Sequence, residues 1–293
     1  GRVRFTIDAE GYVTENIYDA VGNVVETVRY EKQIEAELSD DELDIQRKLS
    51  DLAWKADFND SNKTLVDYGF EGVNSDEGEF SIADGKLRSE SLNGDLAYTY
   101  KNIGAYEDSQ VIRSEFTPGE TDVLEQKCLL SYFALYDLLE PDTYSNPALR
   151  MSINTSGDGY FNLRVSGINY TGCSRGSFDD QYPENRTYIT EFVTRVDEEL
   201  GKEYIDLYFY AKGESRGSAI GSSEKDIANG WGDLEFDYEE NSSVGVLNKI
   251  DNITFNKNVG KRDGSEISIR YVYDDLGRVR FTIDAEGYVT ENI

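Results

Sequence analysis

The sequence predicts a mostly β protein, and three observations support that prediction. The 293 residues include 21 Tyr and 13 Phe but one Met and no His, and aromatic and β-branched residues favour sheets. Short segments that alternate polar and apolar residues recur along the chain, separated by Gly, Asn, Asp and Ser. Residues 1–17 and 277–293 both read GRVRFTIDAEGYVTENI, a sequence rich in strand-forming residues. We therefore expect hairpins at both ends and a large β domain between them.

The shared seventeen residues indicate an internal repeat. One copy starts at Gly1 and the other at Gly277, which gives a period of 276 residues. A fixed period is the signature of repeat architectures, in which each unit meets its neighbours through the same interface. We expect the chain to represent one period, with a short overlap, of a longer tandem array.

Joining residue 293 to residue 18 brings two similar units into succession. Tyr-Asp pairs, each followed three residues later by Gly-Arg or Gly-Asn, then recur 21 residues apart. These residues are Tyr273, Asp274, Gly277 and Arg278, followed by Tyr18, Asp19, Gly22 and Asn23. Alternation broken by Asp-x-x-Gly predicts strand, turn and strand. Glycine allows the positive φ of such a turn, and the Asp side chain can accept hydrogen bonds from backbone N–H groups.

This pattern resembles the Rhs/YD-repeat family, whose repeats form stacked β-hairpins. The motif Tyr-Asp-x-x-Gly-[Arg/Asn] is followed by Asp-x-x-Gly-x-x-Thr, which adds Asp284, Gly287 and Thr290 to the matching residues. The resemblance covers the two ends of the chain. Asn292 stands where a family member would place a Tyr, and Asp263-Gly264 lies two residues too far from Tyr273 for another regular unit. Each period thus has too few units to close a cage, and the resemblance implies hairpin joints between copies.

A helix is predicted after the first hairpins, from about Asp40 to Ala53. Ser39 and Glu42 have the spacing of a capping box, acidic residues fill the first turn, and the following apolar residues have helical spacing. We expect this helix to be a spacer that packs against a hairpin, and the alternative is a helix that binds a partner. The predicted organisation is hairpins at 1–30, a helical linker at 31–53, a sandwich at 54–259 and a hairpin at 260–293.

The middle of the chain predicts a two-sheet β-sandwich, because many short alternating segments follow one another without a helix-length pattern. The clearest segments are Lys86–Ser91, Leu96–Tyr100, Val111–Phe116, Leu129–Tyr136, Arg150–Asn154, Tyr160–Val165, Tyr188–Val196, Tyr204–Ala211, Gly232–Tyr238 and Ile250–Phe255. The segment Lys249–Phe255 (KIDNITF) resembles the closing strand of concanavalin A-like (laminin G-like) jelly-roll domains. Phe58, Phe70-Glu71-Gly72 and Gly85-Lys86-Leu87 fit the same family.

The best catalytic candidates are Glu235, Asp237 and Glu239, which alternate along one strand and so share one face. Retaining β-glucanases of the jelly-roll fold use this E-x-D-x-E spacing, with their two carboxyl groups about 5 Å apart. Those enzymes continue with many further strands, whereas this domain is expected to close within about twenty residues. We therefore interpret the three carboxylates as a solvated acidic face on an edge or outer strand. The chain has no His for a Ser-His-Asp or Cys-His arrangement, and we predict no enzymatic activity.

Glycan binding is the alternative that the concanavalin A-like resemblance implies, because such domains can bind sugars through loop carboxylates, Asn and aromatic side chains, often around Ca²⁺. The oxygen ligands would be Asp57, Asn59 and Asp60, or Asp158, Asp179 and Asp180. All of these residues also suit ordinary turns. No other cofactor is expected.

Two kinds of extracellular modification are open to this chain. Cys128 and Cys173 are the only cysteines, and they form either one disulfide or two buried thiols. Seven N-x-[ST] sequons are candidate glycosylation sites, namely Asn59, Asn62, Asn154, Asn169, Asn185, Asn241 and Asn252.

The charge of the chain limits its partners. The net charge is −29 and the isoelectric point is about 4.3, which argues against nucleic acid and anionic lipid. No run of about 18 apolar residues predicts a membrane span. We predict an extracellular or cell-surface structural unit, a piece of a filament, stalk or coat that contacts copies of itself head to tail. The alternative is an array of glycan-binding adhesin units.

Overall fold

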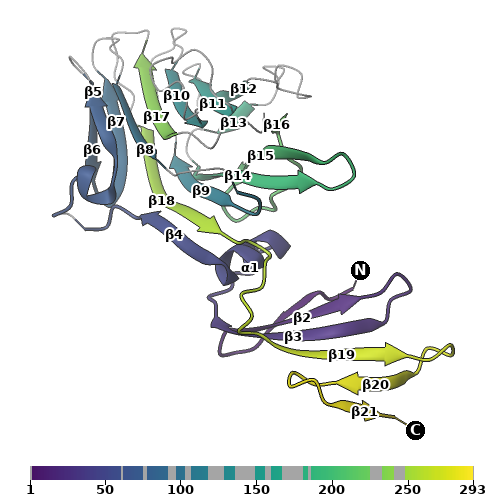
Figure 1. The fold of residues 1–293 in the computed structure, drawn as a ribbon. Helices are drawn as coiled ribbons and strands as arrows, with labels where there is room; N and C mark the ends of the chain where they lie inside the picture. Colours follow the sequence, from purple (N-terminus) through teal and green to yellow (C-terminus); the bar gives the residue numbers. More distant parts are fainter. Residues whose placement is uncertain are drawn as a thin grey trace. The chain divides into compact units, whose positions relative to one another are not determined.

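A computed structural model describes most of the chain. The described residues are 2–60, 62–74, 78–91, 97–102, 107–117, 129–135, 149–155, 160–166, 181–183, 186–224, 233–240 and 248–292. The contacts divide the chain into two compact units (Figure 1). Unit 1 comprises Gly1–Asp51 and Asn258–Ile293, and unit 2 comprises Leu52–Lys257. The first and last segments of the chain therefore fold together in unit 1.

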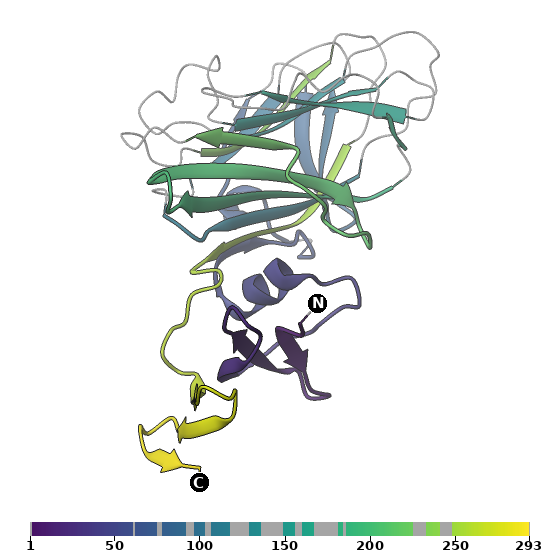
Figure 2. The same ribbon diagram turned by 90° about the vertical axis from the view of Figure 1, so that its right-hand side faces the viewer.

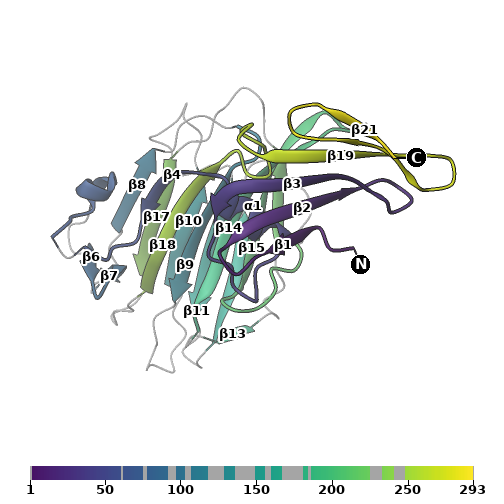
Figure 3. The same ribbon diagram turned by 90° about the horizontal axis from the view of Figure 1, so that it is seen from below.

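Unit 1 is built on one antiparallel sheet of six strands. Its strands are β1 (Phe5–Ile7), β2 (Tyr12–Tyr18), β3 (Val24–Gln33), β19 (Ile267–Tyr273), β20 (Val279–Ile283) and β21 (Val289–Glu291). Their order in the sheet is β1-β2-β3-β19-β20-β21, and Figure 3 shows β1, β2, β3 and β19 side by side. The two ends of the chain meet where β3 pairs with β19, for example Arg29 opposite Ile267. As a result β1 and β21 are the two edges of the sheet.

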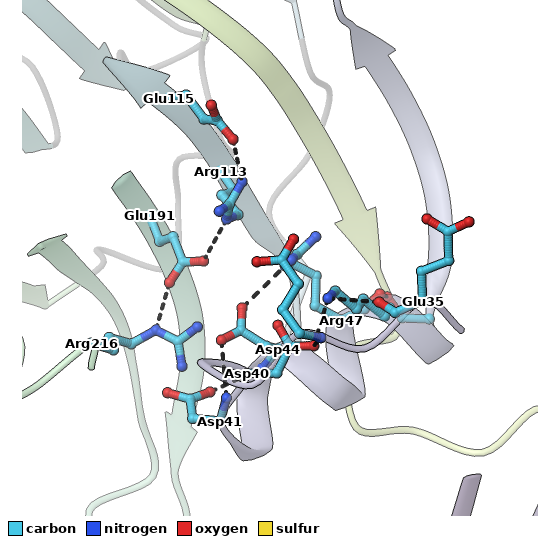
Figure 4. A network of polar contacts seen from close by, with 12 residues as sticks. Glu35, Asp40, Asp41, Asp44, Arg47, Arg113, Glu115, Glu191 and Arg216 are labelled. Atoms are coloured by element: carbon cyan, nitrogen blue, oxygen red, sulfur yellow. Dashed lines mark hydrogen bonds and ion pairs between the residues drawn. The ribbon is translucent and has the colours of Figure 1, made fainter. Parts of the chain in front are cut away.

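The helix of unit 1, α1 (Glu42–Leu49), is shorter than predicted and has a different cap. Its N-cap is Asp41, whose side chain accepts from the Asp44 N–H at 3.1 Å while the Asp44 carboxylate accepts from the Asp41 N–H at 3.2 Å (Figure 4). The prediction of Ser39 and Glu42 as the capping box was wrong, because Asp41 and Asp44 have the same spacing. The helix ends before Ala53 because β4 (Asp51–Ala56) pairs with another strand, β18 (Asn248–Lys257).

One face of the unit 1 sheet is covered by α1 and the segment before it. Val13, Ile34 and Ile45 form a buried apolar cluster. Partly buried side chains of Phe5, Ile7, Tyr30 and Leu49 pack against it. The predicted packing of the helix against a hairpin is confirmed, since Ile45 and Leu49 of α1 contact side chains of β1 and β2.

Unit 2 is a two-sheet β-sandwich, as predicted (Figure 2). Besides β4 and β18, its strands are β5 (Glu71–Asn74), β6 (Gly78–Ala83), β7 (Lys86–Ser91), β8 (Ala97–Asn102), β9 (Val111–Thr117), β10 (Leu129–Leu135), β11 (Leu149–Thr155), β12 (Tyr160–Ser166), β13 (Gln181–Pro183), β14 (Tyr188–Asp197), β15 (Lys202–Ala211), β16 (Gly221–Glu224) and β17 (Asp233–Glu240). A 3₁₀ turn spans Val66–Tyr68. Each of the ten segments named from the sequence coincides with one of these strands.

The two sheets of unit 2 differ in strand order. One runs β13-β12-β11-β10-β17-β8-β5, and the other runs β16-β15-β14-β9-β18-β7-β6, with β4 added on β18. Aromatic side chains connect the two sheets: the ring of Tyr182 on β13 lies 5.3 Å from that of Phe209 on β15, which stacks on Tyr188 of β14 at 4.9 Å. Burial raises the pKa of Tyr188 to about 12, consistent with a hydroxyl that donates to the Pro183 carbonyl at 2.8 Å. None of the helices in the described ranges is long and apolar enough to cross a membrane.

Candidate joint between repeated units

Four turns of unit 1 share the sequence Asp-x-x-Gly and one geometry. In each turn the Gly N–H donates to the Asp carbonyl at 2.9 to 3.2 Å. The N–H of the residue after Gly donates to the Asp carboxylate at 2.8 or 2.9 Å. The glycine φ angles lie between +75° and +109°. The turns are Asp8–Gly11, Asp19–Gly22, Asp274–Gly277 and Asp284–Gly287. The turn roles predicted for these Asp and Gly residues are confirmed.

Three of the turn carboxylates, those of Asp8, Asp19 and Asp274, have a pKa below the ordinary value. The Tyr12 N–H holds the pKa of Asp8 below its ordinary value, and the Arg278 N–H does the same for the pKa of Asp274. Burial opposes this effect at Asp19, but hydrogen bonds from Asn23 and its neighbours still lower the pKa of Asp19. A negative charge is therefore part of each of these three turns.

The tyrosine of each Tyr-Asp pair donates a hydrogen bond to the backbone of a neighbouring segment of the sheet. The Tyr18 hydroxyl donates to the Val3 carbonyl at 2.8 Å, and the Tyr273 hydroxyl donates to the Val24 carbonyl at 2.9 Å. Val3 and Val24 occupy equivalent places in the 21-residue register read from the sequence. The two Tyr-Asp units therefore share a tertiary contact as well as a turn.

The repeated sequence forms the same hairpin twice. We call residues 1–17 the first copy and residues 277–293 the second copy, of which the structure describes 2–17 and 277–292. In the first copy Ile7 pairs with Val13, and in the second copy Ile283 pairs with Val289. The remaining pairs also correspond, as does the N–H donation from Asn16 or Asn292 to the carbonyl of the facing arginine, at 2.7 and 2.8 Å. The first copy contains one edge strand of the sheet, β1, and the second copy contains the other, β21.

The first copy is covered by the residues that follow it. The Glu15 carboxylate is 4% exposed and accepts from the Tyr30 hydroxyl at 2.8 Å and from Arg4 Nε at 2.9 Å. Arg4 also pairs with Glu42 of α1. Burial, with the hydrogen bond to Glu15, raises the pKa of Tyr30. The Glu15 carboxylate is thus contacted by Tyr30 of β3 and by Arg4, which precedes β1 and in turn pairs with Glu42 of α1.

The second copy has the same hairpin and a different environment. Val289 is 61% exposed, whereas the equivalent Val13 is 0% exposed. Tyr288 is 73% exposed. The Arg280–Glu291 ion pair repeats the Arg4–Glu15 pair. In the sheet order β21 has one neighbour, β20, while its equivalent β2 lies between β1 and β3.

A shallow hollow of about 450 Å³ lies on unit 1 beside the first copy. Its lining consists of Tyr12, Arg29, Tyr30, Glu31 and Ile267. The Arg29 guanidinium lies 4.9 Å from the centre of the Tyr12 ring and 3.3 Å from the Asp8 carboxylate. Tyr12 lies on β2 of the first copy, and Arg29, Tyr30 and Glu31 lie on β3, so the hollow lies where these two strands pair.

A second polar cluster, on unit 2, was missed by the sequence reasoning. Glu191 on β14 is fully buried, and its carboxylate accepts from Arg216 Nε at 2.6 Å and lies 3.4 Å from Arg113 Nε on β9 (Figure 4). Glu115, two residues along β9, pairs with Lys212 at 2.8 Å. Opposite charges thus compensate one another on adjacent strands. The alternation of Arg113 and Glu115 was a visible signal, but their partner lies more than seventy residues away in the sequence.

The three candidate catalytic carboxylates lie on an interior strand. Glu235, Asp237 and Glu239 belong to β17, which pairs with β10 on one side and with β8 on the other. The expectation of an edge or outer strand was wrong, because the long connections around β17 bring distant strands to both of its edges. Their alternate positions still share a face. Among the described residues of unit 2, β18 is the one strand that follows β17, which agrees with the expected early end of the domain.

Two of the candidate metal ligands, Asp57 and Asp60, make local contacts in the structure. Asp57 pairs with Lys55 at 3.0 Å, and this hydrogen bond lowers the pKa of Asp57. Asp60 accepts from the Asn62 N–H at 3.0 Å, as an ordinary turn residue does. The described part of the chain contains no group of three His, Cys, Asp or Glu residues suited to hold a metal ion. Asp158, Asp179 and Asp180 lie outside the described residues.

The sequons and cysteines are only partly described. Asn59 and Asn62 are exposed and precede the 3₁₀ turn. Asn154 lies on β11, and Asn252 lies half-buried at a bulge of β18 with a φ of 47°. An exposed loop is the more accessible place for a sugar. The other sequon positions and both cysteines fall outside the described residues, namely Asn169, Asn185, Asn241, Cys128 and Cys173.

No protein-family model matches the chain, and no curated protein matches it in sequence. Among solved structures it is similar to the carbohydrate recognition domain of Emp47p, with 10% identity, a TM-score of 0.47, and coverage of 70% of this chain and 95% of that one. It is also similar to a GlcNAcα1-4Gal-releasing endo-β-galactosidase from Clostridium perfringens, with 9% identity, a TM-score of 0.47, and coverage of 89% and 85%. A third similar structure is the exoplasmic/lumenal domain of VIP36 in a Ca²⁺/Man2-bound form, with 10% identity, a TM-score of 0.39, and coverage of 64% and 80%. The resemblance of the chain ends to the YD-repeat family stays a prediction.

Proposed function

We propose that this chain is one unit of a tandemly repeated extracellular protein whose units are joined through the sheet of unit 1. The observation that supports the proposal is the formation of one hairpin twice, in the same register, at opposite edges of a single sheet. Placing the second copy of one unit where the next unit has its first copy continues the sheet. Four strands are then added with each period.

The spacing of strands makes this proposal quantitative. Neighbouring strands lie about 4.8 Å apart, so four strands advance the sheet by about 19 Å. Neighbouring strands are also rotated by about 20–25°, so successive units are rotated by about 80–100°. A domain of about 200 residues is roughly 40 Å across, which is wider than the distance of about 19 Å between successive units along the axis. The rotation would distribute successive sandwiches around the axis and so avoid a clash.

Glycan binding is the candidate function of unit 2. It is supported by the resemblance of the closing strand to concanavalin A-like domains. The similar structures are named for carbohydrate binding or carbohydrate cleavage, and none of the three is named as a filament protein. Those names include binding domains and a glycosidase, and at TM-scores below 0.5 they transfer no activity to this chain. An adhesin array needs both the joint and a binding site, whereas a filament, stalk or coat needs only the joint.

Electron microscopy of the native material tests the joint. We expect regular assemblies with an axial rise of about 19 Å per unit and a rotation of about 80–100°. Beads on a flexible string would contradict a continuous sheet, and the proposal would then fail.

A glycan-array screen of the full chain tests unit 2, with the Glu235→Gln/Glu239→Gln double variant as the matched control. Binding by both chains, without release of reducing ends, supports an adhesin. Release of reducing ends by the parent chain alone would show an enzyme and contradict the prediction. If binding survives a chelator, Ca²⁺ is not required. The absence of any bound glycan would leave the filament as the function of the array.

A further inference from the structure

We propose that the second copy is completed by residues 24–49 of the following copy of the chain, with β3 of that copy pairing with β21 and its α1 covering the apolar face. This inference rests on the proposed array and specifies its interface. These residues are the proposed occupant because the same residues, 24–49, already cover the first copy, which has the same sequence as the second copy.

The apolar contacts provide the first argument. In the first copy Val13 is fully buried against Ile34 and Ile45, with Leu49 beside them. The same valine in the second copy, Val289, is 61% exposed. Removing apolar surface from water is favourable, so a free second copy lacks an interaction that its sequence is suited to make.

The strand edge provides the second argument. In the first copy β2 pairs with β3, with Thr14 opposite Arg29 and Asn16 opposite Thr27. A free edge strand offers unpaired backbone groups to another chain. The same register would place Thr290 opposite Arg29, and Asn292 opposite Thr27, of the following copy. The hollow beside Tyr12 would then form again beside Tyr288.

Charge complementarity provides the third argument. Arg4 pairs with both Glu15 and Glu42, and Glu15 also accepts from the Tyr30 hydroxyl. The Arg280–Glu291 pair is already in place in the second copy. Tyr30 and Glu42 of the following copy would add a hydroxyl donor for Glu291 and a carboxylate for Arg280, so the interface would bury compensated charges.

A glycine provides the fourth argument, because it leaves room for the incoming backbone. Ile34 donates its N–H to the Gly11 carbonyl at 2.9 Å. A Cβ on Gly11 would lie 2.6 Å from the Ile34 carbonyl oxygen, whereas a Cβ on Gly287 would meet nothing within 4 Å. The equivalent glycine of the second copy would therefore accept Ile34 of the following copy without a clash.

The test uses a two-period chain, residues 1–293 followed directly by residues 18–293, with one Val289→Cys substitution. The cysteine is placed either at the joint, in the first period, or at the end, in the second period. Thiol labelling of the parent two-period chain is subtracted as background for Cys128 and Cys173. We expect the joint cysteine to react at least tenfold more slowly than the terminal cysteine. Equal fast labelling of both would overturn the inference.

A second pair of variants protects the test against general misfolding. Ile45→Asp in the second period should restore fast labelling of the joint cysteine, because it removes the cover supplied by the following α1. The same substitution in the first period should leave the joint cysteine slow. Protection that ignores both substitutions would overturn the inference, because α1 would then not be the cover.

The failure of this interface and the failure of the proposed array give different results. A fast joint cysteine together with regular native assemblies of the expected rise rejects the interface and keeps the array. A slow joint cysteine that depends on Ile45, together with flexible native material, keeps the interface between two neighbours and rejects the extended assembly.

Discussion

The first and second copies compare one amino-acid sequence in two environments. Both fold into the same hairpin, with the same pairing and the same Asp-x-x-Gly turn. They differ in burial, since Val13 is enclosed and Val289 is open. The backbone of a tight hairpin depends on hydrogen bonds between residues a few positions apart, which both copies have. Burial depends on which residues pack against the hairpin, and residues of β3, of α1 and of the segment between them pack against the first copy. Matched substitutions in the two copies can therefore separate these effects.

The largest difference is expected for a charge at the valine. Val13→Asp should destabilise unit 1 by about 4 kcal/mol or more, because an unpaired carboxylate would be placed in an apolar cluster. Val289→Asp should change stability by no more than about 0.5 kcal/mol, as exposed substitutions do. Hydrogen exchange of the β3 amides would report the free energy of opening unit 1. Equal losses from both variants would mean that the two environments do not differ.

The next largest difference is expected at the turn glycines. Gly287→Ala should cost about 1–2 kcal/mol, because alanine is strained at a φ of +86°. Gly11→Ala should cost about 1–3 kcal/mol more, because its Cβ would also clash with the Ile34 backbone. Urea unfolding followed by tyrosine fluorescence measures both variants. A Gly287→Ala variant as unstable as Gly11→Ala would contradict the open environment of the second copy.

A smaller difference is expected at the glutamates. Glu15→Gln should destabilise unit 1 by about 1–3 kcal/mol, because Arg4 and Tyr30 lose a charged acceptor in a buried setting. Glu291→Gln should cost less than about 1 kcal/mol, because the Arg280–Glu291 pair is exposed. High salt should reduce the free-energy cost of Glu291→Gln but not that of Glu15→Gln. Equal costs and equal salt dependence would contradict this expectation.

The smallest effect is expected from acid, and here two separate turns should agree. The pKa values of Asp8 and Asp274 are lowered in the folded state, so their contribution to stability is present above the unfolded value of 3.8 and is lost as pH falls through the folded values. Carboxyl NMR titration should give midpoints below 3.8 for both. Asp8→Asn and Asp274→Asn should each reduce the acid dependence of stability below about pH 4. A midpoint at or above 3.8 would show that the turn hydrogen bonds do not favour the charged form.

Local sequence patterns were sufficient for much of the fold. Alternation located ten strands of the sandwich, and the Asp-x-x-Gly spacing located the turns with their hydrogen bonds. Local patterns were less reliable where two candidates competed. Ser39 and Asp41 each have an acidic residue three positions later, and the structure places the cap at Asp41.

Long-range pairing decided what no local pattern could. Glu235 belongs to an interior strand because β10 and β8, far apart in the sequence, lie on either side of β17. Glu191 can be buried because β14 pairs with β9 and brings Arg113 beside it. The order of strands in a sheet is set by contacts between distant segments, so an alternating strand shows which residues share a face and not which strand will cover its edge.

By itself the sequence determined the repeat, the hairpin and the turn chemistry of this protein. These features rest on identity at a fixed offset and on hydrogen bonds within a few residues, and both can be read along the chain. The tertiary structure decided that the two copies lie at opposite edges of one sheet and that only the first is covered. The physical reason is that burial is a property of a neighbourhood, and the residues that bury Val13 are supplied by β3, α1 and the segment between them.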